Sequence, residues 1–483
     1  MAMNHHQLIT WLDEHTAEFT AISDAIWDQP ELGYHEFFAS KLQSDFLESQ
    51  GFTVKRDVGG MNTAFIAEWG QGKPVFGFAG EFDALPGLSQ KDQFTPEPVE
   101  EGAPGHGCGH NLLGVGCMAA AVAVKEWLQA NEQQGTVRYY GCPAEEGGAG
   151  KTFMARAGLF DDLDLAFNYH PSSMTFAHKG SNVGVNHLRF RFHGRTAHAG
   201  GAPWAGRSAL DAVELMNVGV NYLREHVTKD VRLHYVITNG GKAPNIVPDE
   251  AEVWYYIRAH EPQNLVDVTD RVRDIARGAA LMTSTKMEEI FESATSSLLP
   301  NYYLSDLHYA AMQKLGPIIY TKDELAYASR INEALEYDYD NLRKRIENSH
   351  ASEEVKAMVQ ELVGLPVIGQ PLPAWNEGEI AGGSTDVGDL SRVVPVVELV
   401  TTCWAVGVPG HSWAVTATGR HSIGHKGMLY AAKVMASVAV ECYQHPEHIE
   451  KAWDEFHQRQ PEGYQCPIPE GIDPPRYTNP AAE

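Results

Sequence analysis

The segment Gly105–Asn111 reads GHGCGHN, so a cysteine and two histidines stand on a glycine-rich stretch with nothing apolar to bury. Thiolate and imidazole groups bind divalent transition metals such as zinc and manganese. Cys108 and His110 are two residues apart, and both side chains could face one ion. A glycine-rich surface turn could hold the same residues, so the interpretation as a metal site requires matching ligands elsewhere in the chain.

Candidate partners follow two later apolar segments. Glu145 and Glu146 come after the segment 135–142, and His170 lies near the end of the segment 162–171. Adjacent carboxylates past the end of a strand are costly to place together without a cation. A glutamate pair alone is ordinary surface, but joined to the cysteine motif it becomes a candidate base plus ligand.

Asp83 follows a third apolar segment, in the sequence GEFDALPG. An aspartate at this place could orient a ligand histidine or brace a metal site without touching the ion. A turn aspartate would fit the local sequence about equally well. On the local sequence alone, both interpretations of Asp83 stay open.

The elements that must position these side chains alternate between strands and helices. Apolar spacing predicts two helices within 8–50, separated by a turn at Pro30 and Gly33. It then predicts strands and one buried helix in the order 63–70, 74–87, 111–130 (the helix), 135–142 and 162–171. This alternation implies an α/β fold with a mainly parallel sheet and helices on both faces. Polar groups just past the strand ends of such a sheet converge on one crevice.

The pattern changes at residue 183. Strands and two helices over 183–297 predict a smaller α+β domain of about one hundred residues. The predicted organisation is therefore a catalytic domain in two parts, 1–182 and 298–483, with 183–297 inserted between them. Within the second part, the charged and uneven segment 321–361 predicts a solvated helical insertion.

Composition narrows the classes of function. The 483-residue chain has 37 basic and 63 acidic residues, a net charge of −26. This balance argues against nucleic acid or an anionic membrane as a partner, and an anionic substrate would need its own local cations. Six dispersed cysteines without CxxC spacing indicate reduced thiols and a cytoplasmic protein. No signal sequence and no apolar run of about 18 residues is recognised, so no membrane segment is expected.

The chain resembles the M20 family of metal-dependent amidohydrolases and peptidases, in the subgroup with a cysteine in its metal loop. The resemblance runs over nearly the whole chain through the motifs PELGYHE, GEFDALPG, GHGCGHN, PAEEGG, AFNYHP, TAHAGGAPWAGRSALDA, NIVPD, GGSTDVGD, GVPGHSW and YQCPIP. It implies a metallopeptidase-type α/β catalytic domain with an inserted lid or dimerisation domain. Asn111, Leu113 and Glu81 depart from the family pattern, which has an aspartate, a histidine, and a histidine or aspartate at these positions.

The resemblance implies a site for two divalent metal ions, zinc or manganese. Its implied ligands are Cys108, which bridges the two ions, and His110, Glu146 and His170. Glu145 would be the general base that takes a proton from water and passes it to the leaving amine. Asp83 would support the ligands from outside the metal shell.

The last ligand is expected to be a C-terminal histidine, and three candidates compete: His411, His421 and His425. His411 is favoured because it follows the predicted strand 394–407 by a short loop, as ligands at strand ends do. His425 is expected near the N-terminus of the closing helix, where a neutral imidazole can be a structural cap.

The smaller domain carries three further candidates by resemblance. His198 matches the family histidine that reaches across a dimer to polarise the scissile carbonyl, a role like that of an oxyanion-hole donor. Asn245 and Arg258 match positions associated with the carboxylate end of the substrate. Without the resemblance, His198 is an exposed loop histidine and Arg258 a solvated side chain. In a chain of net charge −26, however, an anionic substrate needs such donors.

The expected activity is hydrolysis of the amide bond of an aryl- or acyl-amino acid, most specifically of p-aminobenzoyl-glutamate to p-aminobenzoate and glutamate. A dipeptidase or an N-acyl-amino-acid deacylase with the same metal site is the alternative within the family. A partner-dependent subunit of a hydrolase heteromer is the alternative of another class, although the complete ligand set argues against an inactive scaffold. The expected assembly is a homodimer, or one that includes a related second subunit.

Overall fold

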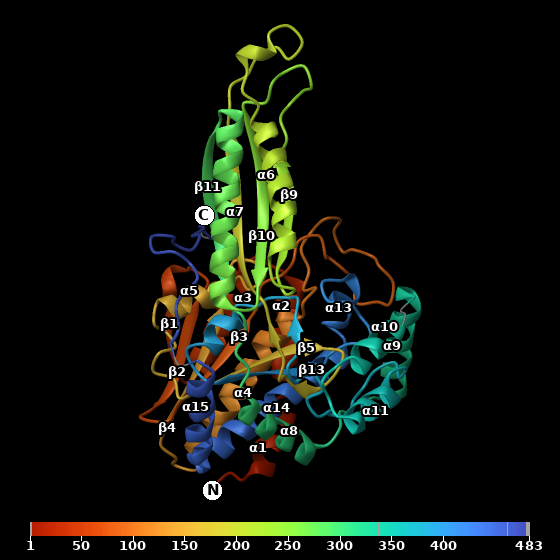
Figure 1. The fold of residues 1–483 in the computed structure, drawn as a ribbon. Coiled ribbons are helices and arrows are strands. Elements are labelled where there is room, and N and C mark those ends of the chain that lie inside the picture. The colour runs from red at the N-terminus through yellow and green to blue at the C-terminus, as the bar shows by residue number, and fades with distance from the viewer. Residues whose placement is uncertain (1, 337–338, 461, 480–483) are drawn as a thin grey trace.

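The computed structural model describes residues 2–336, 339–460 and 462–479, and a seven-stranded sheet lies at its centre (Figure 1). Its strands follow the spatial order β1 (Thr53–Arg56), β2 (Phe65–Gln71), β4 (Gly135–Cys142), β3 (Val75–Glu81), β5 (Leu165–Ser172), β13 (Val396–Thr402) and β6 (Phe176–Ala177). The four strands from β4 to β13 are parallel, and the outer strands pair antiparallel. The mainly parallel sheet predicted from the sequence is confirmed, although the short strand β1 was not predicted.

The parallel strands end at one edge of the sheet, where the chain turns into loops. Glu81 is the last residue of β3, Glu145 follows β4, His170 lies near the end of β5, and His411 follows β13. From β3 the chain continues to β4 on one side of the sheet, and from β5 it continues to β6 on the other side. The loops that leave the neighbouring strands β3 and β5 therefore run in opposite directions. A crevice opens at such a point in an α/β sheet, and the candidate residues surround it.

Helices cover both faces of this sheet. One face and its large apolar core involve α1 (His5–Glu14), α2 (Thr16–Asp28), α3 (Phe37–Ser49), α4 (His110–Ala130), α8 (Tyr302–Leu315) and α14 (Ser422–Gln444). The opposite face packs against α5 (Gly150–Arg156) and α12 (Val387–Ser391), and α15 (Glu447–Arg459) contributes to both cores. A short helix, α13 (Trp413–Thr418), precedes α14.

The N-terminal segment forms three helices where the sequence predicted two. The additional break lies at His15, between α1 and α2, where the backbone leaves helical geometry. The His15 ring stacks on Trp11 with ring centroids 4.0 Å apart, which gives the break a stable packing partner. The predicted turn around Pro30 and Gly33 is present between α2 and α3.

Helix α4 is buried along most of its length against the central sheet. By length and composition it passes the test for a membrane-crossing helix, a property that the sequence analysis did not recognise. Within the protein, 94% of its 18-residue apolar window is buried. Because α4 lies between the strands β3, β4 and β5 and the helix α14, its apolar composition is that of a core helix.

A second sheet of four antiparallel strands forms an arm that stands on the larger unit (Figure 1). Its order is β11 (Lys286–Thr295), β8 (Gly184–His193), β10 (Glu250–Ala259) and β9 (Arg232–Asn239). Helices α6 (Ala209–Leu223) and α7 (Pro262–Thr283) pack on one face of this sheet around a separate apolar core. These elements occupy 184–295, inside the segment 183–297 that the sequence analysis set apart.

The charged segment 321–361 contains α9 (Lys322–Leu335), α10 (Tyr339–Glu347) and α11 (Glu353–Leu362). It is more than a solvated insertion, because Ile346 and Val359 are fully buried. They pack in an apolar cluster with Phe176 and Trp375, which ties the insertion to strand β6 of the central sheet. The strands β7 (Ser181–Asn182) and β12 (Ile380–Ala381) form a separate parallel pair of two residues each. β7 precedes the insertion in the chain and β12 follows it.

Two glycines provide a matched test of the close packing between α4 and β3. A β-carbon on Gly114 would lie 2.6 Å from the carbonyl oxygen of Glu81, whereas one on Gly278 in α7 would meet nothing within 4 Å. Gly114→Ala should therefore lower the free energy of unfolding by about 1–3 kcal/mol through overpacking. Gly278→Ala should raise it by up to about 1 kcal/mol, because alanine favours the helix. Urea unfolding measures both, and an unchanged midpoint for Gly114→Ala would contradict the tight α4–β3 contact.

Candidate metal centre

The loop before α4 depends on backbone conformations and contacts that suit glycine. Gly109 has a φ of 75°, in the left-handed region, and it directly precedes His110, the first residue of α4. A β-carbon on Gly105 would lie 1.9 Å from a backbone oxygen of the neighbouring loop. His106, the other histidine of the motif, is buried with its Nε2 3.2 Å from a backbone oxygen of α2. The loop therefore turns Cys108 and His110 toward the crevice and places His106 elsewhere.

The five predicted metal ligands form two groups. Cys108, His110 and His170 make one group, and Cys108, Glu146 and His411 make the other, with the ligand atoms of each group within 4.8 Å of one another. Cys108 Sγ lies 3.4 Å from His170 Nε2, and Glu146 Oε1 lies 3.4 Å from His411 Nε2. Cys108 is common to both groups, so its sulfur stands where it could contact two ions.

Asp83 positions two of these ligands without belonging to either group. Its Oδ1 accepts a hydrogen bond from Nδ1 of His110 at 3.0 Å, and its Oδ2 accepts one from the backbone N–H of Glu146 at 2.9 Å. Burial opposes ionisation, but these hydrogen bonds outweigh it and hold the pKa of Asp83 below its ordinary value. The contact also leaves Nε2 as the free ligand atom of His110.

The electrostatics of the cluster favour added positive charge. Among the described residues, three buried atoms here have no hydrogen-bond partner: Glu81 Oε2, His110 Nε2 and Glu146 Oε1. Burial, and then the charges of Glu81 and Glu146, raise the pKa of Glu145 well above its ordinary value. Burial likewise raises the pKa of the Cys108 thiol. Divalent cations would partner the orphaned atoms and offset the repulsion, so these residues fit a metal site.

The structure separates the three C-terminal histidines. His411 donates its backbone N–H to the carbonyl oxygen of Gly107 at 2.9 Å, and its side chain belongs to the second donor group. His411 also has a φ of 56°, a strained conformation that the surrounding contacts maintain. His421 caps the N-terminus of α14, and His425 Nε2 lies 2.9 Å from an Asp24 oxygen in α2. The position of His411 after β13 is thus the one that brings an imidazole to the cluster.

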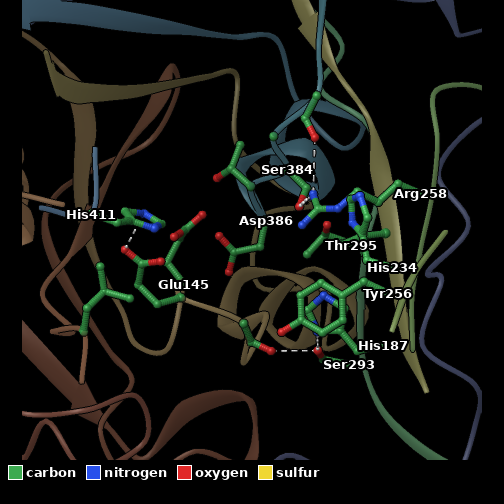
Figure 2. A pocket seen from close by; sticks show the side chains of 17 residues that line it. Glu145, His187, His234, Tyr256, Arg258, Ser293, Thr295, Ser384, Asp386 and His411 are labelled. Atoms are coloured by element: carbon green, nitrogen blue, oxygen red, sulfur yellow. Dashed lines mark hydrogen bonds and ion pairs between the residues drawn. The ribbon is translucent and has the colours of Figure 1, made fainter. Parts of the chain in front are cut away.

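Glu146 and His411, from the second donor group, line a cavity of about 500 Å³ that lies between the central unit and the arm. Figure 2 shows Glu145 and His411 at one side of this cavity and Arg258 and His234, from the arm, at the other. Arg258 donates a hydrogen bond to Ser384 Oγ at 2.8 Å. The cavity therefore has the carboxyl group of Glu145 and the guanidinium group of Arg258 on opposite walls.

His198 and Asn245 do not line this cavity. Both are exposed in loops at the top of the arm, where Ala199 donates its backbone N–H to the carbonyl oxygen of Asn245 at 3.0 Å (Figure 1). Strand β8 begins beside the cavity, which Val185 lines, and it runs about 25 Å at ~3.3 Å per residue before these loops start. His198 and Asn245 therefore lie in neighbouring loops of the arm. Both are distant from the donor groups of their own chain.

Three buried residues of the site were not identified from the sequence: Glu81, Lys151 and Asp386. Lys151 Nζ lies 2.7 Å from Glu81 Oε1 and 2.5 Å from Asp386 Oδ1. Lys151 and Asp386 are 235 positions apart in the chain, so no local pattern indicates the pair. The signals in the sequence were indirect, namely the departure at Glu81 and the GGSTDVGD motif around Asp386.

The departure at Asn111 has a structural explanation. The Asn111 amide nitrogen donates to Ser23 Oγ at 3.0 Å and to the carbonyl oxygen of Gly419 at 2.9 Å. These contacts join α4 to α2 and to the segment before α14. Asn111 therefore supports the packing behind the cluster and does not belong to either donor group.

Known proteins share the sequence features of this chain. Residues 77–441 match the model for the peptidase family M20/M25/M40. The chain is 44% identical to one of the subunits of the p-aminobenzoyl-glutamate hydrolase of Escherichia coli K12, over 94% of this chain and 95% of that protein. It is 33% identical to the Xaa-Arg dipeptidase of Mus musculus, over 65% of this chain and 72% of that protein.

A solved structure shares the fold. It is a dinuclear metal-binding peptidase of the M20 family from Bacillus subtilis, with a TM-score of 0.55 and 17% sequence identity. The match covers 89% of this chain and 99% of that chain. The two proteins therefore share a fold over most of both chains.

The positions of the C-terminal histidines predict different effects of their substitution on metal content. His411→Ala should lower the divalent metal retained after dialysis against a chelator, because it removes an imidazole from a donor group. His425→Ala, the matched control, should retain the wild-type metal content, because its partner is Asp24. Elemental analysis of both variants measures the difference. Loss of metal in His425→Ala with none in His411→Ala would reverse the assignment.

Proposed function

Because the chain belongs to the peptidase family M20/M25/M40 and is a hydrolase of amide bonds, we propose that it cleaves an aryl- or acyl-amino acid, with p-aminobenzoyl-glutamate as the first candidate. The family resemblance seen in the sequence motifs is confirmed by the family match. The observation that carries the proposal is the pair of donor groups that share Cys108, the second of which lines a cavity together with Glu145 through Glu146 and His411. The relative with 44% identity over 94% of the chain supports the choice of substrate.

Two divalent ions, zinc or manganese, would be held by the two donor groups: one by Cys108, His110 and His170, and the other by Cys108, Glu146 and His411. When bound, such ions polarise the amide carbonyl and lower the pKa of a water molecule toward neutrality. Asp83 fixes the tautomer of His110 through Nδ1, so that Nε2 is presented to the site. The backbone N–H of Glu146 donates to the same aspartate. Asp83 therefore contacts one residue of each donor group and fixes their relative positions.

Glu145 would be the residue that moves protons. Two observations support this role: it lines the cavity, and its carboxylate lies within 4.8 Å of a ligand atom of His110. As general base it takes a proton from water, and as general acid it gives that proton to the departing amine. Its raised pKa in the unneutralised cluster, caused first by burial and then by Glu81 and Glu146, would fall when cations are bound.

Arg258 supports an anionic amino-acid end for the substrate. Its guanidinium lies over the Tyr256 ring, with 5.7 Å to the ring centroid, and its Nη1 is held by Ser384. These contacts fix the group on the wall opposite Glu145 (Figure 2). A guanidinium held in this way binds a carboxylate with defined geometry. The amide to be cut would then lie between Arg258 and the metal side.

The exposed position of His198 supports a homodimer in which each arm serves the other chain. Nδ1 of His198 accepts hydrogen bonds from the backbone N–H groups of Gly200 and Gly201, at 3.2 Å and 3.0 Å. In the neutral ring, Nε2 then carries the proton and is a hydrogen-bond donor for a developing oxyanion. Because His198 and Asn245 stand far from the cavity of their own chain, a second copy is the partner whose cavity they would complete.

The arm offers a surface for that second copy. Strand β9 is an edge strand of its sheet, and Val236 and Ile237 on it are 54% and 40% exposed. Helix α6 beside it exposes Val218 and Tyr222, at 51% and 75%. An unpaired strand edge with adjacent apolar side chains is suited to pairing with an identical edge across a two-fold axis. Such pairing would cover these side chains and fix both arms.

Alternatives remain within and outside this class. A dipeptidase or an N-acyl-amino-acid deacylase would use the same residues and differ in the cavity, and the dipeptidase relative supports it. The bacterial relative, which is named as one subunit of a hydrolase, supports a chain that works only with a related second chain.

We propose that the protein is cytoplasmic, because its six cysteines are free thiols.

Cys108→Ala tests the shared donor. Wild-type protein stripped with a chelator and reconstituted should hold close to two ions per chain and hydrolyse p-aminobenzoyl-glutamate. Cys108→Ala should lose both metal and activity, because its sulfur belongs to both donor groups. Cys117→Ala is the matched control, since Cys117 is buried in α4 and belongs to neither group. Metal without hydrolysis would leave another amide or a missing second chain as the explanation, and absence of metal in wild type would overturn the proposal.

Mixing two inactive variants tests the exchange of arms. His198→Ala and Glu145→Gln should each be nearly inactive alone, because one removes the carbonyl donor and the other the base. Subunit exchange should restore hydrolysis, since a mixed dimer holds one site with native His198 and native Glu145. The measurement is activity after co-refolding, with each variant refolded alone as the control. Full activity of His198→Ala by itself would show that the arm histidine does not act in the reaction.

A further inference from the structure

Glu81 lies beneath the donor groups and has no role in the ligand set described above. It is the last residue of β3 and is 1% exposed. Its Oε2 lies 3.3 Å from His110 Nε2, and both atoms are buried without a hydrogen-bond partner among the described residues. Glu81, His110 and Glu145 form a third group whose ligand atoms lie within 4.8 Å of one another.

The two oxygens of the Glu81 carboxylate have different environments. Oε1 forms an ion pair with Lys151 Nζ at 2.7 Å. Oε2 is the atom left facing His110 Nε2, and that imidazole is itself fixed by Asp83. The carboxylate thus has one oxygen held by an ammonium group and the other oxygen free. This arrangement suits a carboxylate that binds a metal ion through a single oxygen.

Two simpler roles for Glu81 do not account for this arrangement. A substrate-contacting or proton-transferring role requires access to the cavity, but Glu145 lines it and Glu81 does not. A purely structural ion pair with Lys151 explains Oε1, but it leaves Oε2 buried and unpartnered beside an equally unpartnered imidazole nitrogen. His110 Nε2 is the atom that faces the donor groups and Glu81 Oε2 lies 3.3 Å from it, so one cation bound at Nε2 would lie beside Oε2 and could partner both atoms.

We infer that Glu81 Oε2 is a further protein ligand of the ion held at His110 Nε2, with Lys151 and Asp386 as its positioning residues. The inference rests on the proposed metal function of the site. It would give that ion a carboxylate ligand in addition to thiolate and imidazole, and carboxylate ligands suit manganese better than thiolates do. Glu81 would then replace, by a different side chain, the histidine or aspartate of the family pattern.

Lys151 and Asp386 hold Glu81 in a single orientation. Lys151 is fully buried, and Asp386 accepts from both its ammonium, at 2.5 Å, and its backbone N–H, at 2.7 Å. Burial alone would lower the pKa of Lys151, but Asp386 and Glu81 raise it well above its ordinary value, so the lysine stays charged. Asp386 belongs to none of the three donor groups, which makes it a control for effects transmitted through Lys151.

The test loads wild type, Glu81→Gln and Asp386→Asn with cobalt(II) and records visible absorption and the chelator concentration that removes the metal. Both variants replace one carboxylate by an isosteric amide next to Lys151. Glu81→Gln should change the cobalt bands and release one ion at a chelator concentration at least about 10-fold lower, the smallest loss typical of disturbed metal surroundings. Asp386→Asn removes no ligand atom and acts on Glu81 only through Lys151, so it should shift the bands and the release midpoint less than Glu81→Gln does.

Wild-type bands and the same release midpoint in Glu81→Gln as in Asp386→Asn would overturn the inference and reduce Glu81 to an ion-pair partner. If Glu81→Gln does not fold by circular dichroism, Glu81→Asp keeps the charge and withdraws the oxygens by one methylene, with the same expected change in the bands. Anomalous diffraction from wild-type crystals with cobalt provides a measurement without a variant. A peak about 2.0–2.2 Å from Glu81 Oε2 supports the inference, and a peak outside bonding distance overturns it.

Failure of this inference can be distinguished from failure of the proposed function. Wild type that binds cobalt and hydrolyses p-aminobenzoyl-glutamate, together with unchanged bands in both Glu81 variants, would retain the hydrolase and remove only the extra ligand. Wild type that binds no cobalt would overturn both.

Discussion

Acidic side chains crowd together because the parallel strands of the central sheet all end at the same edge. Glu81, which is buried, ends β3, and the half-buried Glu145 and Glu146 follow β4, so strand geometry brings their carboxyl groups into one small space. Lys151 is the buried lysine that offsets part of this charge, through Glu81 and Asp386. The remaining repulsion, visible in the raised pKa of Glu145, makes the cluster a strong site for cations and a costly one without them.

Close packing holds this edge in place. Helix α4 lies against the strands because glycine occupies the nearest positions, such as Gly114 over the end of β3 and Gly116 over Tyr169. The same helix begins at His110, so the position of one candidate metal ligand is set by the contact between helix and sheet. A larger residue at these glycines would lift α4 and move His110 relative to Asp83. The stability of the core and the geometry of the donor groups therefore depend on the same contacts.

The arm links assembly to chemistry. Its sheet has an apolar core of its own, and it carries Arg258 at the end next to the cavity and His198 in the loops at the opposite end. The arm thus carries a guanidinium group beside the cavity of its own chain and an exposed imidazole far from that cavity, which are the groups proposed to bind the substrate carboxylate and the scissile carbonyl. Under the proposed dimer, the affinity of the two chains and the completeness of each active site would depend on one surface. This coupling would explain why exposed apolar side chains occur on α6 and β9.

Local patterns in the sequence determined much of this protein. The alternation of strands and helices, the motif around Cys108 and His110, and the acidic pair at Glu145 are properties of short segments, and strand-end geometry joins them on one crevice. The choice among His411, His421 and His425, the packing of Ile346 and Val359 under a charged insertion, and the contact of Lys151 with Asp386 were decided by tertiary structure. They depend on which side chains meet across long separations in the chain, and the period of a helix or strand carries no information about such meetings.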